Sequence, residues 1–367
     1  MIPSLKRLSW RSFLARPRLP SPSPEVLDML YRQPMLVTGA GGSIGSALAV
    51  RLAALAPSML VLLEASESHL YTLQREWAEA GVAAPTTHFL GSVSDRALLD
   101  HIFAAHNPRI VFHAAAFKHV PLMEQQPLAA IANNVFGTHT LVAAAAAHGT
   151  RVVLLSTDKA VAPTSIMGAT KRVAEHIVLA AGGTVLRLGN VLASRDSVAE
   201  VFARQISAGG PITVTDPAAR RYFLTLDEAV NLLLIAAAEP DPPVLLTPAL
   251  PKPHYIADLA QYMTRKLAPN RTISIDFTHP RPGDKETEQL WSSSESARPA
   301  ALNGLLAVQS PVLPDGQLQS ELTALRGALD VRDLPAAIAQ LGALVPGYAP
   351  SEAMLAQAGQ GGAQVSI

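Results

Sequence analysis

Short apolar runs alternate with helical stretches through the first half of the chain, and this rhythm constrains the fold most strongly. Apolar runs begin near Pro34, Met59, Arg109 and Arg151, and each is followed by a stretch with helical periodicity. Buried strands that alternate with helices in this way form a parallel, doubly wound sheet with right-handed connections. The sequence therefore predicts an α/β protein built on a Rossmann-like doubly wound parallel sheet.

A glycine-rich turn follows the first predicted strand and opens the first helix. The segment "TGAGGSIG" spaces Gly39, Gly42 and Gly45 as G-x-x-G-x-x-G. In this context glycines let backbone amides approach the pyrophosphate of a dinucleotide. Glu64, at the end of the next strand, can accept hydrogen bonds from the adenosine ribose and would repel a 2′-phosphate. We therefore expect NAD rather than NADP; the alternative for Glu64 is a solvated carboxylate at a strand end.

Beyond about Asn190 the strand and helix rhythm breaks into pieces punctuated by proline, which predicts a smaller C-terminal substrate-binding domain. We divide the chain into an N-terminal basic arm and linker (1–33), an NAD-binding Rossmann domain (34–189), a mainly substrate-binding domain that can interleave with the Rossmann core (190–300), and a C-terminal helical extension with a frayed end (301–367).

Charge and cysteine content exclude several classes of partner and site. Lys and Arg number 29, as do Asp and Glu, so no global field steers the chain toward nucleic acid. Cysteine is absent, which excludes disulfides and thiolate metal sites and fits a cytoplasmic location. The histidines lack metal-binding spacing, and His113 is interpreted as a scaffold residue, so we expect no metal. The apolar stretch "LVAAAAAHG" from Leu141 is judged too short to span a bilayer.

The N-terminal arm is strongly basic, with five cationic residues before the first acid, Glu25: Lys6, Arg7, Arg11, Arg16 and Arg18. Its apolar residues could form one stripe of a short helix: Leu5, Leu8, Trp10, Phe13 and Leu14. One interpretation is peripheral contact with a membrane surface. We favour an arm packed on the body or on a partner subunit, because prolines soon interrupt the segment.

Several separated strings converge on one family: "TGAGGSIGS", "HAAAFKHVPLME", "NNVFGT", "STDKAVAPTSIMGATKR", "LRLGNVL", "RYFLTLDEA" and "RPGDKETEQL". Together they resemble the extended short-chain dehydrogenase/reductases of capsule and glycan synthesis, specifically the UDP-N-acetylglucosamine 4,6-dehydratases. The similarity runs from about Phe13 to Leu290, and "LVPGYAP" at 344–350 is similar to that family's C-terminal end. The chain resembles the catalytic region without transmembrane helices, and we expect a homo-oligomer.

The catalytic tyrosine of this superfamily is replaced by methionine. Met167 and Lys171 stand one helical turn apart in "MGATK", where related enzymes have Y-x-x-x-K. The resemblance includes a branch with methionine at this position, so the replacement does not by itself imply lost activity. Tyr262 and Lys266 show the literal Y-x-x-x-K spacing, but they lie far beyond the cofactor-binding half and are interpreted as part of a surface helix.

The resemblance implies oxidation at C4 of the sugar, loss of water across C5 and C6, and return of hydride to C6. A thioether cannot move the protons, so the roles fall to "STDK". Asp158 is implied as the acid for the C6 hydroxyl, Lys159 as the base at C5, Thr157 as a hydrogen-bond partner of the C4 oxygen, and Lys171 as a ligand of the nicotinamide ribose. Burial is expected to raise the pKa of Asp158 and lower that of Lys159, although pairing of the two groups would oppose both shifts. The alternative is that "STDK" is only a capped turn.

Further site residues follow from the same alignment of motifs. The cofactor-binding candidates are Gly39, Gly42, Ser43, Ile44, Gly45, Glu64, Ser92, Val93, Ala114, Ala115 and Lys171. The substrate-binding candidates are Lys118, His119, Asn134, Asn190, Arg221 and Arg281, where the arginines could bind the diphosphate or form surface salt bridges.

Four positions depart from the family pattern. Ser92 replaces a carboxylate expected at adenine, and Ser165 stands where asparagine is common. Asp196 falls near the expected diphosphate, and Arg220 could offset its charge. The predicted function is NAD-dependent dehydration (a hydro-lyase reaction) of a UDP-N-acetylhexosamine, expected to be UDP-GlcNAc, for polysaccharide synthesis. The alternatives are a UDP-sugar epimerase of the same fold and a non-catalytic NAD-sensing scaffold.

Overall fold

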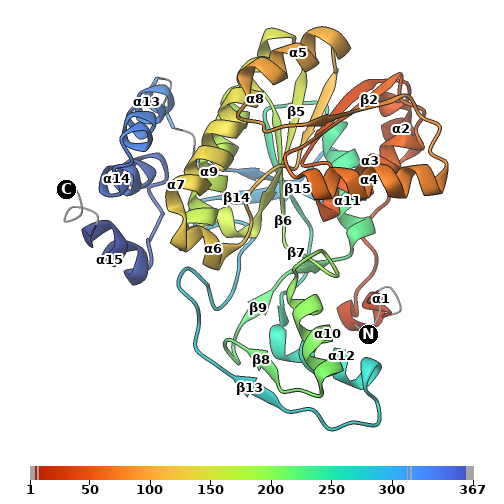
Figure 1. The fold of residues 1–367 in the computed structure, drawn as a ribbon, viewed down its shortest axis with the longest axis vertical. Coiled ribbons are helices and arrows are strands. Elements are labelled where there is room, and N and C mark those ends of the chain that lie inside the picture. The colour runs from red at the N-terminus through yellow and green to blue at the C-terminus, as the bar shows by residue number, and fades with distance from the viewer. Residues whose placement is uncertain (1–4, 6–7, 312, 315, 361–367) are drawn as a thin grey trace.

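The computed structural model describes residues 5, 8–311, 313–314 and 316–360, and its centre is one large sheet with helices on both faces (Figure 1). The nine strands lie in the order β14-β15-β11-β6-β5-β4-β1-β2-β3. From one edge to the other they are β14 (Ser296–Pro299), β15 (Leu305–Gln309), β11 (Val244–Pro248), β6 (Thr184–Leu188), β5 (Arg151–Thr157), β4 (Ile110–His113), β1 (Pro34–Thr38), β2 (Met59–Glu64) and β3 (Thr86–Leu90). The predicted doubly wound α/β fold is confirmed.

All strand pairs from β3 to β11 are parallel, whereas β15 runs antiparallel to β11 and β14 antiparallel to β15. Successive strand residues are buried on opposite faces: Leu36 and Val111 belong to one apolar core, and Val37 and Phe112 to the other. Strands buried on both faces need continuous apolar runs, which is the pattern in the sequence.

Helices cover each face of the sheet. One core includes residues of α5 (Arg96–His106), α6 (Val120–Gln125), α8 (Thr138–Ala147) and α9 (Ile166–Ala180). The other includes residues of α2 (Pro24–Leu30), α3 (Ser43–Ala53), α4 (Glu67–Ala80) and α11 (Leu226–Ala237). Because α11, β11, β14 and β15 return to this body from beyond Asn190, the later part of the chain contributes directly to the central sheet.

One continuous helix contradicts the expectation that the apolar stretch from Leu141 is too short to span a bilayer. α7 (Pro127–Ala130), a π-helical segment (Ile131–Gly137) and α8 together form a helix from Pro127 to Ala147, 21 residues with a mean hydropathy of 1.2 in its most apolar window. Length and composition therefore suffice for a membrane span, contrary to the expectation. However, 61% of that window is buried inside the fold, as in a core helix of a globular domain.

A second lobe lies below the sheet in Figure 1. It contains α10 (Val198–Ala208), α12 (Ile256–Leu267) and the parallel pair β8 (Ile212–Val214) and β13 (Ile275–Phe277). Two short ladders connect this lobe to the body: β7 (Asn190–Val191) with β10 (Phe223–Leu224), and β9 (Arg220–Arg221) with β12 (His254–Tyr255). A separate apolar core fills it.

The N-terminal arm packs on this lobe through α1 (Trp10–Leu14). Phe13 meets the rings of Phe223 and Tyr262 at centroid distances of 5.8 and 5.5 Å. The hydroxyl of Tyr262 donates to the carbonyl of Ser9 at 2.6 Å, and Tyr262 is only 7% exposed. α12 is thus the amphipathic surface helix that the sequence predicts, with Lys266 exposed and Tyr262 on the buried face, against the arm. Lys6 and Arg7 lie outside the described residues.

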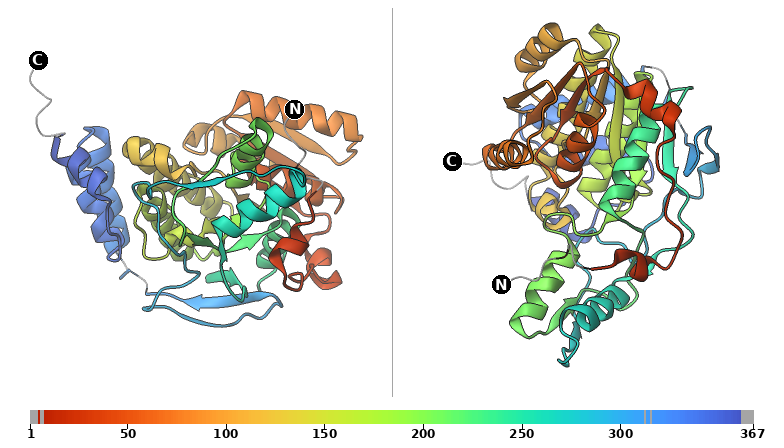
Figure 2. Two further views of the ribbon diagram at one scale, coloured as in Figure 1. Left: turned by 90° about the horizontal axis from the view of Figure 1, so that it is seen from below. Right: turned by 90° about the vertical axis from the view of Figure 1, so that its right-hand side faces the viewer.

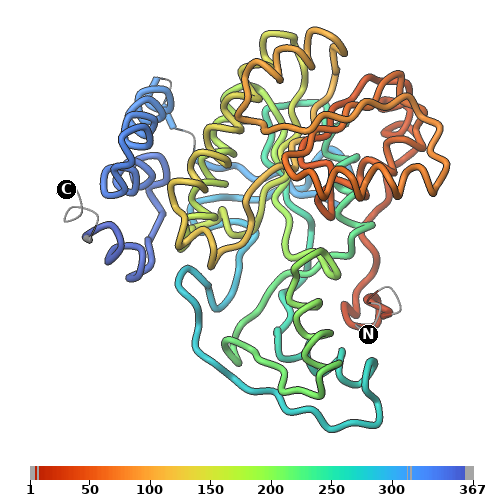
Figure 3. The backbone as a smooth tube through the Cα atoms, viewed as in Figure 1, coloured from red at the N-terminus to blue at the C-terminus, as the bar shows by residue number. Residues whose placement is uncertain are grey.

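The C-terminal extension consists of α13 (Gln317–Asp330), α14 (Leu334–Leu344) and α15 (Glu352–Gln360). It lies on the side of α7 and α9, away from α1, as Figures 1 and 3 show and the views in Figure 2 support. Its junction with the body is partly apolar, since Leu341 and Leu344 belong to the same core as residues of α8 and α9. It is also polar: the amide of Ala349 donates to the carbonyl of Pro163, and the hydroxyl of Ser351 donates to Glu124 Oε2 at 2.8 Å. The extension thus contacts the loop that leads into α9.

Candidate functional site

The glycine turn between β1 and α3 is shaped for close approach by a ligand. Gly39 has a φ of +66°, and a Cβ on it would lie 2.7 Å from the backbone nitrogen of Ala115. A Cβ on Gly45 would lie 2.1 Å from the carbonyl oxygen of Gly39. Gly42, which precedes α3, has no side chain to cap the helix, so the amides of Ser43 and Ile44 in its first turn can face an anion. These features fit the pyrophosphate of a dinucleotide.

Glu64 supports this turn from the end of β2. Its Oε2 accepts from the amide of Gly41 at 2.8 Å, and its Oε1 accepts from the amide of Ser66 at 2.9 Å. Glu64 is 8% exposed, so it is not a solvated carboxylate. Each carboxylate oxygen has a second lone pair, which leaves acceptor capacity for the ribose hydroxyls expected there.

The remaining cofactor candidates lie at the ends of neighbouring strands. The amide of Ala114 donates to the carbonyl of Thr38, which holds β4 and Ala115 against the glycine turn. Ser92 follows β3 and accepts from the amide of Ser94 at 3.1 Å, so its hydroxyl forms a local turn, while Val93 is buried in the apolar core. The carboxyl ends of β1 to β4 thus converge on one edge of the sheet.

Arg195 closes the turn from the other lobe, and sequence reasoning missed it. Its guanidinium donates to the carbonyl of Gly41 at 2.7 Å, and its amide donates to the hydroxyl of Ser43 at 2.8 Å. The carbonyl of Arg195 in turn accepts from Lys118 at 2.8 Å. No local pattern announces these contacts, because they join segments that are far apart in the chain.

Two buried bases lie behind the turn. The imidazole of His113 bridges the hydroxyls of Thr38 and Thr138 at 2.8 and 3.0 Å, and burial, with a smaller effect of Lys171, lowers its pKa to about 3. His113 is thus a neutral scaffold residue. Lys171 donates to the carbonyl of Leu155 at 2.7 Å, and burial lowers its pKa to about 8 despite the charge of Glu175.

The "STDK" segment forms the carboxyl tip of β5 and a following turn of 3₁₀ helix (Asp158–Ala160). Thr157 donates to Asp158 Oδ1 at 3.0 Å, and Lys159 Nζ donates to the same oxygen at 3.0 Å. Asp158 is 0% exposed, and its Oδ2 has no hydrogen-bond partner within the described part of the chain. A buried carboxylate oxygen of this kind favours the protonated acid or a ligand that donates to it.

The pKa shifts of this pair agree only in part with expectation. Burial raises the pKa of Asp158, with Glu288 adding to the rise, although Lys159 opposes it. Burial acts to lower the pKa of Lys159, but the charges of Asp158 and Glu288 outweigh it and raise the pKa. The expectation that burial would lower the pKa of Lys159 was therefore wrong, because the opposing charge of Asp158 and the charge of Glu288, which the local sequence does not place there, together outweigh burial.

Glu288 is the second residue that sequence reasoning missed. It is 2% exposed, and its Oε1 lies 3.4 Å from Lys159 Nζ. Lys285 Nζ lies 3.2 Å from Oε2, and Arg221 Nε lies 3.9 Å from Oε1. Burial would raise the pKa of Glu288, but these three cations lower it. Tyr222 belongs to the same region, since burial and the charge of Asp158 raise its pKa.

The candidate substrate residues fall into three groups. Asn190 accepts from Lys159 at 3.1 Å, and Arg221 lies at Glu288, so both border the "STDK" tip. Lys118 and His119 lie near Arg195 and Asp196; His119 is 3.9 Å from the carboxylate of Asp196. The remaining two are Asn134, 1% exposed and fully engaged with Phe117 and Thr170, and Arg281, which forms an exposed salt bridge with Asp284 at 2.9 Å.

Helix α9 packs directly against the "STDK" tip. Met167 is 3% exposed and belongs to the apolar core. A Cβ on the next residue, Gly168, would lie 2.2 Å from the carbonyl oxygen of Lys159, so only glycine fits there. Ser165, the departure from asparagine, caps α9 by accepting from the amide of Gly168 at 3.1 Å. Arg220 does not pair with Asp196; it lies over the ring of Tyr255 at 4.2 Å.

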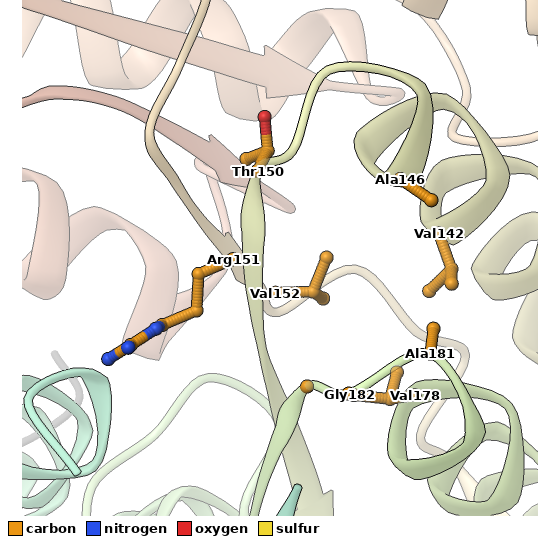
Figure 4. A pocket seen from close by; sticks show the side chains of 9 residues that line it. Val142, Ala146, Thr150, Arg151, Val152, Val178, Ala181 and Gly182 are labelled. Atoms are coloured by element: carbon orange, nitrogen blue, oxygen red, sulfur yellow. The ribbon is translucent and has the colours of Figure 1, made fainter. Parts of the chain in front are cut away.

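A small pocket lies at the opposite end of the sheet (Figure 4). It has a volume of about 40 Å³, and its lining includes Thr150, Arg151 and Val152 from the amino end of β5. The glycine turn and the "STDK" tip lie instead at the carboxyl ends of the strands, where open α/β sheets bind their ligands. The pocket in Figure 4 is therefore not part of the candidate active site.

The polysaccharide biosynthesis protein family matches residues 35–310. The probable polysaccharide biosynthesis protein EpsC of Bacillus subtilis is 38% identical over 74% of this chain and 47% of its own length. The capsular polysaccharide biosynthesis protein CapD of Staphylococcus aureus is 37% identical over 80% of this chain and 50% of its own length. The chain thus spans about half the length of these curated relatives. A UDP-glucose 4-epimerase of Rickettsia rickettsii is 32% identical over 74% of this chain and 81% of its own length.

Solved structures share the fold. Pen from Bacillus thuringiensis superposes with a TM-score of 0.70 at 27% identity, covering 77% of this chain and 89% of its own. The dTDP-glucose 4,6-dehydratase DesIV from Streptomyces venezuelae, solved with NAD bound, gives a TM-score of 0.61 at 20% identity over 70% of this chain and 87% of its own.

Proposed function

Because this chain belongs to the polysaccharide biosynthesis protein family, we propose that it is an NAD-dependent 4,6-dehydratase of a UDP-N-acetylhexosamine, with UDP-N-acetylglucosamine as substrate. One observation carries the proposal: Asp158 is fully buried, with a carboxyl oxygen unpartnered among the described residues, beside Lys159 at the tip of β5. Elimination of water needs an acid and a base in adjacent positions, and this pair supplies both.

The glycine turn supports NAD as the cofactor. Gly39, Gly45 and the open start of α3 would hold the pyrophosphate, Glu64 would accept from the adenosine ribose, and Lys171 would bind the nicotinamide ribose. When bound, NAD would take the hydride from C4 of the sugar and return it at C6. The neighbouring fold with NAD bound, the dehydratase DesIV, is consistent with this choice.

The protein residues would move the protons. In the resting site the proton is on Lys159. Its raised pKa disfavours the neutral amine, which is the form that can act as a base at C5. Asp158, 3.0 Å away and buried, is the nearest acceptor for that proton. Transfer of this one proton would leave a neutral amine to take the C5 proton and a carboxylic acid to protonate the departing C6 hydroxyl. Thr157 would hydrogen-bond the C4 oxygen, whose proton would leave to solvent as the hydride is transferred. Lys159 would return the C5 proton when hydride reaches C6, and Asp158 would regain a proton from solvent.

An epimerase is the second candidate, favoured by the relatives named UDP-glucose 4-epimerase. It would share the C4 oxidation but would need no acid at C6. The placement of Asp158 beside Lys159 favours elimination. A scaffold that binds NAD without turnover remains the non-enzymatic alternative.

The test is incubation of the purified protein and NAD with UDP-N-acetylglucosamine, followed by mass spectrometry and NMR of the sugar nucleotide. The dehydratase predicts a product lighter by one water with a C4 ketone and a C6 methyl group. A product of unchanged mass with inverted C4 would support the epimerase. Bound NAD with unchanged substrate would support the scaffold.

A further inference from the structure

Glu288 reaches the catalytic tip from the segment that follows the second lobe. This carboxylate is 2% exposed and lies among three cations: Lys159 at 3.4 Å, Lys285 at 3.2 Å and Arg221 at 3.9 Å. Lys159 therefore lies between two buried carboxylates, Asp158 and Glu288. Burying several charged side chains close together costs desolvation free energy. The stability of the fold alone therefore does not account for the position of Glu288.

We infer that Glu288 is a positioning residue that holds the ammonium of Lys159 at the tip of β5 and sets how the proton is shared between Lys159 and Asp158. The inference rests on the proposed function and deepens it. Glu288 acts through Lys159 and is not itself placed against the sugar.

The neighbouring strand ends fix the geometry of this contact. Lys159 Nζ is held by three oxygens: Asp158 Oδ1, Asn190 Oδ1 and Glu288 Oε1. Lys285 anchors the Glu288 segment by donating to the carbonyl of Val161 at 2.6 Å, just past the 3₁₀ turn. These contacts fix the position of Lys159 Nζ between the carboxylates of Asp158 and Glu288.

The effect of Glu288 on the pair has a definite sign. The charged and titratable groups around Lys159 are Asp158, Glu288, Lys285, Arg221 and Tyr222. The negative charge of Glu288 raises the pKa of Lys159 and also that of Asp158. Removing that charge must lower the pKa of Lys159 and the pKa of Asp158. Because the two groups share a proton, their pKa values shift together.

The first experiment measures Lys159 directly. Trace acetylation of the purified chain with NAD, at stepped pH and read by peptide mass spectrometry, gives the pH at which Lys159 becomes reactive. In Glu288→Gln this pH should fall by about one unit or more. The matched control is Glu286→Gln, which removes the same charge from an exposed side chain two residues away and should leave the pH unchanged. An unchanged Lys159 in Glu288→Gln would overturn the inference.

The second experiment uses the pH profile of turnover. In Glu288→Gln both limbs of the profile should move together toward lower pH, whereas a merely structural role would lower the rate at every pH and leave the limbs in place. If Glu288→Gln does not fold, Glu288→Asp provides a second test. The shorter side chain keeps the charge but withdraws it from Lys159 Nζ, so the pH of Lys159 acetylation should fall, and no fall would count against the inference. Acetylation needs no turnover, so it tests Glu288 even if the wild type makes no ketone, the result that would reject the dehydratase.

Discussion

Nζ of Lys159 lies 3.0 Å from Oδ1 of Asp158, while Oδ2 of the same carboxylate is buried with no hydrogen-bond partner in the portion of the chain that is described. One oxygen of the acid is thus engaged with the amine, and the other is free to meet a substrate hydroxyl. Burial raises the pKa of Asp158, which favours the protonated form that an acid at C6 must have.

Replacing Asp158 by Asn should abolish dehydration while leaving the fold intact. The amide keeps the size of the side chain but cannot donate an acidic proton, so the rate of ketone formation should fall by about 100-fold or more. Product analysis with UDP-N-acetylglucosamine measures the loss, and bound NAD reports the integrity of the cofactor site. Asp100→Asn, which alters an exposed helix salt bridge, should retain full activity. Normal turnover by Asp158→Asn would exclude the acid role.

Replacing Gly45 by Ala should remove NAD binding. Its Cβ would lie 2.1 Å from the carbonyl oxygen of Gly39, so the turn must open where the pyrophosphate would approach. Titration of NAD by fluorescence or calorimetry measures the effect. Gly342→Ala is the control: it lies within α14 with open space around its Cβ, and it should stabilise the fold by about 0.5–1 kcal/mol. Unchanged NAD affinity in Gly45→Ala would place the cofactor elsewhere.

Replacing Glu175 by Gln should weaken the fold and flatten its response to acid. Burial alone would raise the pKa of Glu175, but Arg187 and Arg172 lower it to about 2. A carboxylate with a lowered pKa stabilises the fold above its unfolded value of 4.5, and this contribution is lost as the pH falls toward 2. The variant should therefore lose about 3 kcal/mol near neutral pH and depend less on pH below that value.

Urea unfolding at stepped pH measures both effects. Glu79→Gln, which removes one partner of an exposed salt bridge with Arg75, should change stability by less than about 1 kcal/mol. An acid response in Glu175→Gln as steep as that of the wild type would assign the acid lability to other carboxylates.

Replacing Tyr262 by Phe tests whether the Y-x-x-x-K spacing of Tyr262 and Lys266 has any role in the reaction that is proposed for the tip beside Met167. The variant loses the hydrogen bond to the carbonyl of Ser9 and should be destabilised by about 1 kcal/mol, with ketone formation unchanged. Thermal unfolding and a turnover assay on the same preparation provide the two measurements. A large fall in the rate at unchanged stability would give this tyrosine a role in the reaction.

The sequence predicts the parts of this protein that depend on neighbours along the chain. The apolar runs predicted the parallel sheet, and the glycines after β1 predicted the turn at the start of α3, because both patterns arise within a few residues. The N-terminal arm shows what a local pattern leaves open. Its apolar stripe was compatible with contact to a membrane surface or to the protein body, and only the packing of Phe13 on Phe223 shows that it contacts the body.

The charges of the site could not be predicted in this way. Burial was expected to lower the pKa of Lys159 against the pairing with Asp158. Glu288 adds to the effect of Asp158, and its motif gave no sign of where its side chain would lie. Arg195 likewise meets Gly41 and Ser43 only after the two lobes come together. Interactions of this kind are set by the tertiary fold, and local sequence patterns do not contain them.

Arg187 is fully buried between two carboxylates, Glu175 on α9 and Glu295 just before β14. During synthesis the ribosome releases Glu175 and Arg187 well before Glu295, so the emerging chain carries this guanidinium with half of its counter-charge. The early strands can pair at that stage, but the charge cluster that Ser156 joins by donating to Glu175 stays incomplete. The buried guanidinium therefore has both of its carboxylate partners only after the chain has been made as far as Glu295, just before the late antiparallel edge of the sheet.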